Sequence, residues 1–432
     1  MAEENNSVGL APPTRLEILG ESEQAPADSI METIAVVVFH GMGQQVKFET
    51  LDMLAQALID AHKAGGGETA KCARHVWCGD REVRRFFPRV EIELQDAQGN
   101  ARNVHVYEAY WAPLTEGAIS FLSTVGFFLR AGVRGIYTSL KDDRKFLRWA
   151  FGREREFPLA PATFIYLVMG TAALAALVLL LTGGTYWLWP AELRESLLFD
   201  TVLKAGPSAL LLAATLYVIW KTRRWIVQYL GDVAIYVGAN EIDRYWKIRD
   251  DIKRECLRVA SVVYRAISRN ESKTDFLYKK VVLAGHSLGS VIAYDTLNAL
   301  VQRDLASNHG MAINVVGRTK TLLTFGSPLD KVAYIFGTQV IGKKIREALA
   351  GGTQPLIVNY DYRPAKWINI YAKMDVIAGR LDYFDDPSSG AGCNKRVQNE
   401  VDGEASWFPS SAHTDYWTHS VLKQSLYESV TG

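Results

Sequence analysis

A serine between two glycines is the residue of this chain with the clearest chemical use. It lies in GHSLG, directly after the buried-strand pattern KVVLA and shortly before the helical pattern VIAYDTLNAL; the five residues are Gly285, His286, Ser287, Leu288 and Gly289. In a strand-to-helix turn of this type the serine takes a strained conformation, and the glycines remove side chains that would collide there. The context predicts that Ser287 is a nucleophile. The alternative is a serine that only caps the following helix.

A second glycine-rich segment could supply the oxyanion site that acyl transfer requires. Residues 34–39 (IAVVVF) are typical of a strand buried on both faces, and the HGMG sequence that follows comprises His40, Gly41, Met42 and Gly43. Two backbone N–H groups stabilise the oxyanion in such sites, and we expect them to be those of Leu288 and Met42. The alternative for HGMG is a tight turn without a ligand.

A carboxylate after a later strand would orient the base of a serine triad. Asp375 follows the strand pattern WINIYAK, residues 367–373, and is the acid that we predict. Asp330, in GSPLD, is the reserve candidate. The further acidic candidates are Asp382, Asp385 and Asp386. The alternative role for Asp375 is an exposed loop charge.

Two histidines follow Asp375 and could serve as the base. His413 lies in SAHTDYW, a loop-like stretch before a helical tail, where an imidazole could reach the serine. His419 lies about a turn and a half further along. We predict that His413 is the base and keep His419 as the alternative. We expect His286 to pack beside the nucleophile.

The elements that must hold these residues alternate between strands and helices. The expected strands are 34–39, 90–95, 104–111, 280–285, 321–326 and 367–373, and the expected helices are 48–63 and 240–267. Residues 98–100 (QGN) form a turn between the second and third of these strands. This alternation predicts an α/β fold with a mostly parallel sheet and helices on both faces.

An uncharged segment interrupts the α/β pattern. The run 157–191 contains no Asp, Glu, Lys or Arg and is long enough to cross a bilayer core, which needs about 20 residues. A shorter uncharged run, 205–220, follows. Together they predict a transmembrane hairpin with helices at about 160–189 and 201–220. The alternative is a pair of buried helices that cap a soluble enzyme.

Basic residues flank the predicted hairpin on both sides. They are Lys141, Arg144, Lys145, Arg148, Arg153 and Arg155 before it, and Lys221, Arg223 and Arg224 after it. Because Lys and Arg concentrate on the cytoplasmic side of a membrane, we expect both long flanking segments to face the cytoplasm. The apolar stretch 117–129 is too short to span, and could be interfacial, re-entrant or part of the soluble core.

Composition excludes several other classes of protein. The chain has 48 Lys and Arg against 47 Asp and Glu, a formal net charge of +1, so we expect no nucleic-acid partner. Cys72, His75 and Cys78 have the spacing of metal ligands but lack a fourth, and ordinary thiols are the favoured interpretation. We therefore expect no metal or cofactor. The segment 1–32 has no apolar core and is interpreted as a mobile polar leader.

Five motifs together resemble a known family. HGMGQQ, GHSLGSVIAYDTL, FGSPLD, NIYAKMDVIAGRLDYFD and AHTDYW are similar, in order and context, to segments of α/β-hydrolase lipases, and most closely resemble the intracellular phospholipase A1 family with a DDHD domain. The resemblance implies Ser287 as nucleophile, Asp375 as acid and His413 as base, and a phospholipid or another acyl-glycerolipid as substrate. The chain departs from the family at Val376-Ile377, where the family motif has Pro-Val.

These observations predict a membrane-anchored serine hydrolase that cleaves acyl esters of lipids through an acyl-enzyme. The expected parts are the leader 1–32, core segments 33–115 and 231–432, and the apolar helical insertion 116–230. The expected partners are the lipid bilayer and an acyl-ester lipid substrate. The alternatives are a soluble esterase or thioesterase with a hydrophobic lid, and a catalytically dead membrane-tethered scaffold.

Overall fold

The structure is a computed structural model in which the α/β region can be described. The described residues are 32–42, 46–68, 70–78, 85–96, 99–115, 242–266, 276–307, 313–330, 332, 359–375, 377–385, 396–407 and 409–432. Nearly all of the predicted leader and the whole insertion 116–230, with its two expected membrane helices and the stretch 117–129, lie outside them. Among the helices that are described, none has the combination of length and hydropathy that a bilayer crossing requires.

The described strands form one mixed, mostly parallel sheet. In chain order they are β1 (Glu32–Phe39), β2 (Ala70–Cys78), β3 (Arg85–Gln95), β4 (Ala101–Ala109), β5 (Lys280–His286), β6 (Thr319–Phe325), β7 (Lys366–Tyr371) and β8 (Val397–Val401). Their order across the sheet is β2-β3-β4-β1-β5-β6-β7-β8. β3 pairs antiparallel with β2 and β4, and every other neighbouring pair is parallel.

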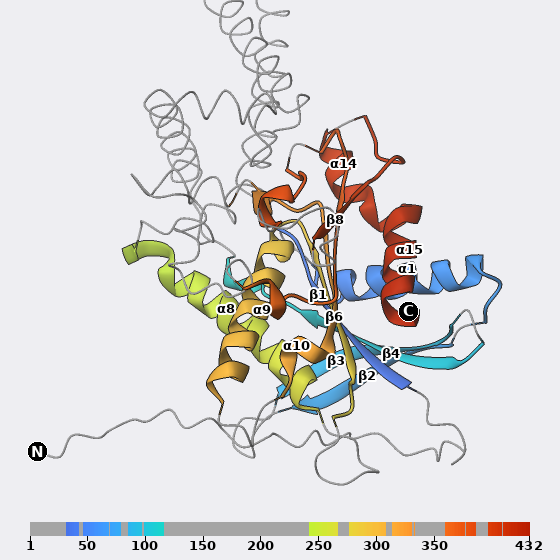
Figure 1. Ribbon diagram of the computed structural model, residues 1–432, viewed down its shortest axis with the longest axis horizontal. Helices are drawn as coiled ribbons and strands as arrows, with labels where there is room; N and C mark the ends of the chain where they lie inside the picture. The colour runs from blue at the N-terminus through green and yellow to red at the C-terminus, as the bar shows by residue number, and fades with distance from the viewer. Residues whose placement is uncertain are drawn as a thin grey trace, which may run out of the picture.

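Helices cover both faces of the sheet. They are α1 (Glu49–Ala64), α8 (Ile242–Arg265), α9 (Leu288–Ala306), α10 (Val315–Arg318), α14 (Pro409–Thr414) and α15 (Ser420–Thr431), with short 3-10 turns η1 (Ala112–Leu114), η5 (Tyr360–Tyr362), η6 (Asp382–Phe384) and η7 (Asp415–Thr418). Figure 1 shows α8 and α9 on one side of the sheet and α1 and α15 on the other.

Strand β1 illustrates how the two halves of the core are built. Its side chains alternate between the faces, as strand geometry requires. Ala35, Val37 and Phe39 pack into the core below α8 and α9, whereas Ile34, Val36 and Val38 pack into the core below α1 and α15. Because both faces are covered, the strand is continuously apolar and completely buried from residue 34 to residue 39.

The register of β1 and β5 brings the two glycine-rich segments together. The strands are parallel, with Phe39 opposite Gly285. Both strands therefore end at the same edge of the sheet, where HGMG begins and where the turn around Ser287 begins. Because β1 and β5 are neighbours in the sheet, HGMG and the turn around Ser287 lie side by side, although the insertion separates them in the chain.

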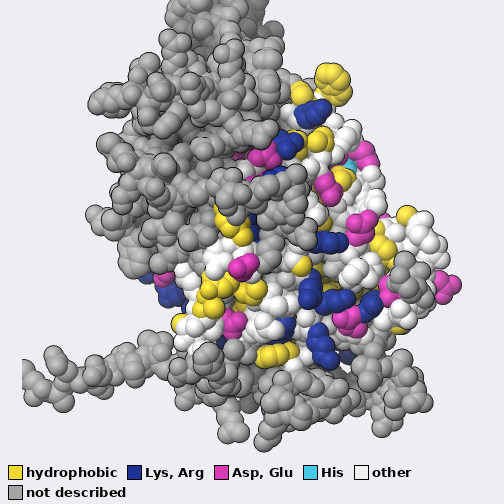
Figure 2. Space-filling model, in the orientation of Figure 1, with side chains coloured by type: hydrophobic (Ala, Val, Ile, Leu, Met, Phe, Trp, Pro, Cys, Tyr) yellow, Lys and Arg dark blue, Asp and Glu magenta, His cyan; other side chains and the backbone are white. Residues whose placement is uncertain are grey.

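The surface drawn in Figure 2 has mixed character. Lys and Arg side chains lie among Asp, Glu and hydrophobic side chains over the described elements. This mixture agrees with the formal net charge of +1.

The predicted α/β class is confirmed, and the strands and helices predicted within the described residues are present with ends shifted by a few residues. The strand pair expected around Gly99 is present, and its two strands are antiparallel. Strands β2 and β8, at the two edges of the sheet, were not predicted. The possible metal ligands Cys72 and Cys78 both lie on β2, where six residues of strand separate their backbones by roughly 20 Å.

Candidate active site

Ser287 occupies a strained turn between β5 and α9. Its backbone has φ 52° and ψ −129°, a conformation that side-chain-bearing residues rarely adopt. Its N–H donates to Phe325 O at 3.0 Å, and its carbonyl accepts from Ser290 N at 2.9 Å. The serine is fully buried and lies at the N-terminus of a long helix, a geometry that presents its hydroxyl at the edge of the sheet.

The glycines around Ser287 allow β1 to approach the turn closely. A Cβ on Gly289 would lie 2.1 Å from Phe39 O, and a Cβ on Gly41 would lie 2.9 Å from the Cβ of Ser287. No side chain fits at either position without displacing backbone or the serine. The HGMG segment therefore lies directly against the serine turn, as the sequence predicted; Gly43 is outside the described residues.

His413, on α14, reaches the serine hydroxyl. Its Nε2 lies 2.9 Å from Ser287 Oγ, and its Nδ1 lies 2.9 Å from Asp375 Oδ2. An ionised Asp375 accepts only, so Nδ1–H donates to it, and Nε2 is left to accept the serine proton. The three residues thus form a continuous hydrogen-bonded chain, and both the imidazole and the carboxylate are buried.

Asp375 is completely buried just beyond β7, and its carboxylate is fully bonded. Oδ1 accepts from the backbone N–H groups of Ile377 (2.8 Å) and Ala378 (3.2 Å), while Oδ2 also accepts from Tyr416 Oη–H at 2.8 Å. Burial opposes ionisation, but the neighbouring His413 and these hydrogen bonds outweigh it and lower the pKa of Asp375. The carboxylate therefore remains ionised beside the imidazole.

His286 connects the serine turn to the base. Its Nε2–H donates to the backbone carbonyl of His413 at 2.9 Å, and its ring stacks on Phe325. Burial, and then the proximity of His413, lower the pKa of His286 to about 3. His286 is therefore neutral, and it packs beside the nucleophile as the sequence predicted.

His40 fixes the start of the HGMG segment. Trp111 N–H donates to its Nε2 at 3.0 Å, so its Nδ1 carries the proton that Gly41 O accepts at 2.8 Å. Burial lowers the pKa of His40 to about 4, against the raising effect of that hydrogen bond. The neutral ring also stacks on Trp111, with centroids 4.7 Å apart. These contacts hold Gly41 and Met42 against the serine turn.

The predicted oxyanion donors lie on the two segments that meet there. Leu288 is the first residue of α9, where backbone N–H groups have no partner within the helix and the helix dipole is positive. Met42 is buried and lies one residue beyond Gly41. An oxygen bound next to Ser287 Oγ would therefore face both segments.

The other candidate acids and the other candidate base lie outside the hydrogen-bonded chain that ends at Ser287. Asp330 is buried after β6, Asp382 pairs with Arg380, and Asp385 accepts from Val397 N. Asp386 lies outside the described residues. The Nδ1 of His419 is bonded to Asp402, not to any of these carboxylates. His413 is the histidine that contacts Ser287, and Asp375 is the carboxylate that contacts His413.

Sequence reasoning missed Tyr416. It lies three residues after His413, on η7, and its hydroxyl reaches the same carboxylate oxygen as the imidazole. The available signal was its position in SAHTDYW, since residues three apart in a helical turn lie on one face.

Among the described residues, no group of three or more His, Cys, Asp or Glu side chains could hold a metal ion. Comparisons with protein-family models, curated proteins and solved structures give no match for this chain.

Proposed function

We propose that this chain is a serine hydrolase of the α/β-hydrolase type that cleaves acyl esters through an acyl-enzyme. The observation that carries the proposal is the hydrogen-bonded chain from Ser287 Oγ through His413 to Asp375, with 2.9 Å at each step. The strained backbone of Ser287 at the end of a central parallel strand adds to it. A serine that only capped helix α9 would need neither the imidazole nor the carboxylate.

In the proposed reaction, Ser287 Oγ attacks the ester carbonyl while its proton passes to His413 Nε2. The protonated imidazole then donates this proton to the departing alkoxide, which leaves the acyl group on Ser287. A water molecule next gives a proton to His413 and attacks the acyl carbonyl; His413 then returns the proton to Ser287 Oγ as the acid leaves. Asp375 keeps the imidazole tautomer in place throughout and stabilises its positive charge.

The tetrahedral intermediates carry a negative charge on the former carbonyl oxygen. The N–H groups of Leu288 and Met42 are proposed to stabilise it, and the positive end of the α9 dipole would contribute. Removal of one such donor typically costs about 10²- to 10³-fold in kcat. His40 and His286, both neutral by burial, add no charge to the site.

We further propose a lipid acyl ester as substrate and a membrane location for the enzyme. The support is the pair of uncharged runs 157–191 and 205–220 with basic flanks, and the resemblance of the five motifs to intracellular phospholipases A1. A hairpin between the strands of the catalytic sheet would keep the site within reach of lipids in the same bilayer, on the cytoplasmic side.

A fluorophosphonate probe tests the chemistry, because it reacts with activated serines. The full-length chain in membranes is labelled as wild type, as Ser287→Ala and as Ser429→Ala, a control in which another buried serine is lost from α15. We expect label on wild type and on Ser429→Ala, and none on Ser287→Ala. Equal label on all three chains, or none on folded wild type in lipid or detergent, would overturn the proposal.

Two further measurements address the lipid and membrane parts. Carbonate extraction separates an integral membrane enzyme from a soluble esterase with an apolar lid: we expect the chain to stay in the pellet. Hydrolysis of phospholipid vesicles, compared with soluble short-chain esters and thioesters, tests the substrate class. Preference for a soluble thioester would refute the lipid assignment while leaving the serine chemistry intact.

A further inference from the structure

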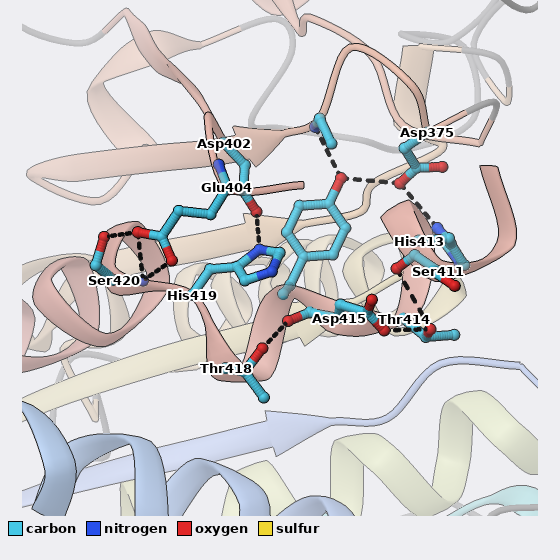
Figure 3. A network of polar contacts seen from close by, with 12 residues as sticks. Asp375, Asp402, Glu404, Ser411, His413, Thr414, Asp415, Thr418, His419 and Ser420 are labelled. Carbon is cyan, nitrogen blue, oxygen red and sulfur yellow. Dashed lines mark hydrogen bonds and ion pairs between the residues drawn. The ribbon is translucent and has the colours of Figure 1, made fainter. Parts of the chain in front are cut away.

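Tyr416 has a hydroxyl in contact with the acid of the candidate site. The side chain is fully buried, and its Oη–H donates to Asp375 Oδ2 at 2.8 Å. The same hydroxyl oxygen accepts from Ala372 N–H at 2.9 Å, just beyond β7. Since that N–H supplies its own hydrogen, the phenol is left to donate toward the carboxylate. Figure 3 shows the bond between Asp375 and the imidazole of His413, the other partner of Oδ2.

The turn that carries Tyr416 is anchored to the end of β7 by a second route. His419 N–H donates to Tyr416 O at 3.1 Å, and His419 Nδ1–H donates to Asp402 Oδ2 at 2.6 Å. Asp402 N–H in turn donates to Tyr371 O at 2.9 Å, at the last residue of β7. The turn is therefore tied to Tyr371 and Ala372, two consecutive residues.

The ring of Tyr416 has little freedom to move. It packs edge-on against His286 and Phe325, with centroids 6.2 Å from each. A Cβ on Gly326, whose φ is +58°, would lie only 3.1 Å from the ring. The hydroxyl is thus held in place from the ring side as well as through its hydrogen bonds.

Burial and a neighbouring carboxylate keep the phenol of Tyr416 protonated. Burial, and then the nearby carboxylate of Asp375, raise the pKa of Tyr416 well above its ordinary value. The titratable groups that face it are Asp375, His286 and, more remotely, Asp402. The hydroxyl is therefore a permanent donor to the acid over the working range of a serine hydrolase.

We propose that Tyr416 is a positioning residue of the reaction proposed above: its O–H fixes the carboxylate of Asp375 so that Oδ2 faces His413 Nδ1. The inference rests on the proposed serine-hydrolase function. Oδ2 accepts from both the imidazole and the phenol, whereas the backbone N–H groups of Ile377 and Ala378 hold only Oδ1. Without the phenol, one side of the carboxylate loses its hydrogen-bond support.

The phenol also affects the charge that His413 experiences. A hydrogen bond from Tyr416 takes up part of the negative charge on Asp375, and its loss leaves a more basic carboxylate facing the imidazole. That carboxylate stabilises the protonated imidazole, which cannot accept the serine proton. Removal of the hydroxyl should therefore move the acidic limb of the kcat/KM profile to higher pH.

The test compares Tyr416→Phe with Tyr427→Phe in the full-length chain. Tyr427 is the control on α15, because its hydroxyl donates to Gln95 O and also contacts His62 Nδ1, so its loss removes hydrogen bonds that have no link to Asp375. Hydrolysis of a short-chain p-nitrophenyl ester is measured from pH 5 to 9. Rates are divided by the fraction of serine that the fluorophosphonate probe titrates, so that unfolded protein does not count.

We expect Tyr416→Phe to lower kcat about tenfold and to change KM by less than about twofold, with the acidic limb at higher pH than in wild type. Tyr427→Phe should match wild type in all three quantities. An active wild type with an unchanged Tyr416→Phe profile would overturn the positioning role and leave the proposed function standing. A wild type that neither hydrolyses the ester nor reacts with the probe would overturn both.

Discussion

His419 donates its Nδ1–H to Asp402 at 2.6 Å, in a second buried histidine–aspartate pair that lies near the pair formed by His413 and Asp375 (Figure 3). In the chain, His413 precedes and His419 follows η7, which runs from Asp415 to Thr418. The pairs differ in their relation to the serine, because the Nε2 of His413 reaches Ser287 Oγ. The first pair therefore belongs to the candidate site, and the second anchors the turn that carries Tyr416.

This difference predicts different results for His413→Gln and His419→Gln. His413→Gln should abolish probe labelling of Ser287, because no other described side chain reaches Oγ to accept its proton. His419→Gln should lower the free energy of unfolding by about 1–3 kcal/mol, since the buried Oδ2 of Asp402 loses its imidazole partner, and should retain labelling within about tenfold of wild type. Denaturant unfolding and labelling rates measure the two effects. Loss of labelling in His419→Gln with His413→Gln unaffected would reverse the assignment.

The assignment of Asp375 as the acid predicts that Asp375→Asn and Asp330→Asn differ in ester turnover. An amide at 375 cannot hold the imidazole in the tautomer that leaves Nε2 free, so ester turnover should fall by roughly 10⁴-fold. Asp330 follows β6 and does not contact His413 Nδ1, so Asp330→Asn should keep turnover within about tenfold. Both variants are compared by kcat/KM on one p-nitrophenyl ester. A larger loss in Asp330→Asn would make Asp330 the acid.

The approach of β1 to the serine turn predicts a strong steric effect at Gly289. A Cβ there would lie 2.1 Å from Phe39 O, so Gly289→Ala must displace backbone on one side or the other. We expect a loss of about 3 kcal/mol in the free energy of unfolding, together with loss of probe labelling. Gly403→Ala is the control, because a Cβ there meets nothing within 4 Å, and its effect should stay within about 0.5 kcal/mol. Equal stabilities for the two variants would contradict the close approach.

The sequence predicted the central strands well because their burial leaves a clear pattern. β1 and β5 are covered on both faces, and their continuous apolar runs identify them. β2 contains Lys71, Arg74 and His75, and β8 has the sequence VQNEV. Both are edge strands with polar side chains, and such strands form because a neighbouring strand supplies hydrogen bonds, a contribution that no local pattern records.

The sequence predicts the residue types of the candidate site, but not all the contacts among them. The turn around Ser287 has a strong local signature. Asp330 and Asp375 both follow adjacent parallel strands, so the chain order alone leaves two acids at one edge of the sheet. Which of the two acids meets the base depends on where α14 places His413, and this tertiary contact leaves no local pattern in the sequence. Tyr416 was missed for the same reason, since its role depends on the carboxylate that it meets.

A buried carboxylate next to helix α1 predicts a pH dependence of stability. Glu108 Oε2 accepts from Phe48 N–H at 2.9 Å, and its Oε1 has no hydrogen-bond partner among the described residues. Burial raises the pKa of Glu108 to about 7, against the lowering effect of the Phe48 bond. The folded state therefore holds a proton that the unfolded state releases near its ordinary pKa of 4.5.

A group with a raised pKa stabilises the fold fully below its unfolded pKa and loses this contribution as pH rises through the folded pKa. Wild type should therefore lose about 2–3 kcal/mol of unfolding free energy relative to Glu108→Gln between pH 4.5 and 7, since the amide keeps an acceptor for Phe48 N–H and does not titrate. Denaturant unfolding across pH 4–8 measures the difference. Glu93→Gln, on the neighbouring strand and exposed, is the control and should show no such slope. Parallel curves for wild type and Glu108→Gln would show that Glu108 is ionised in the fold.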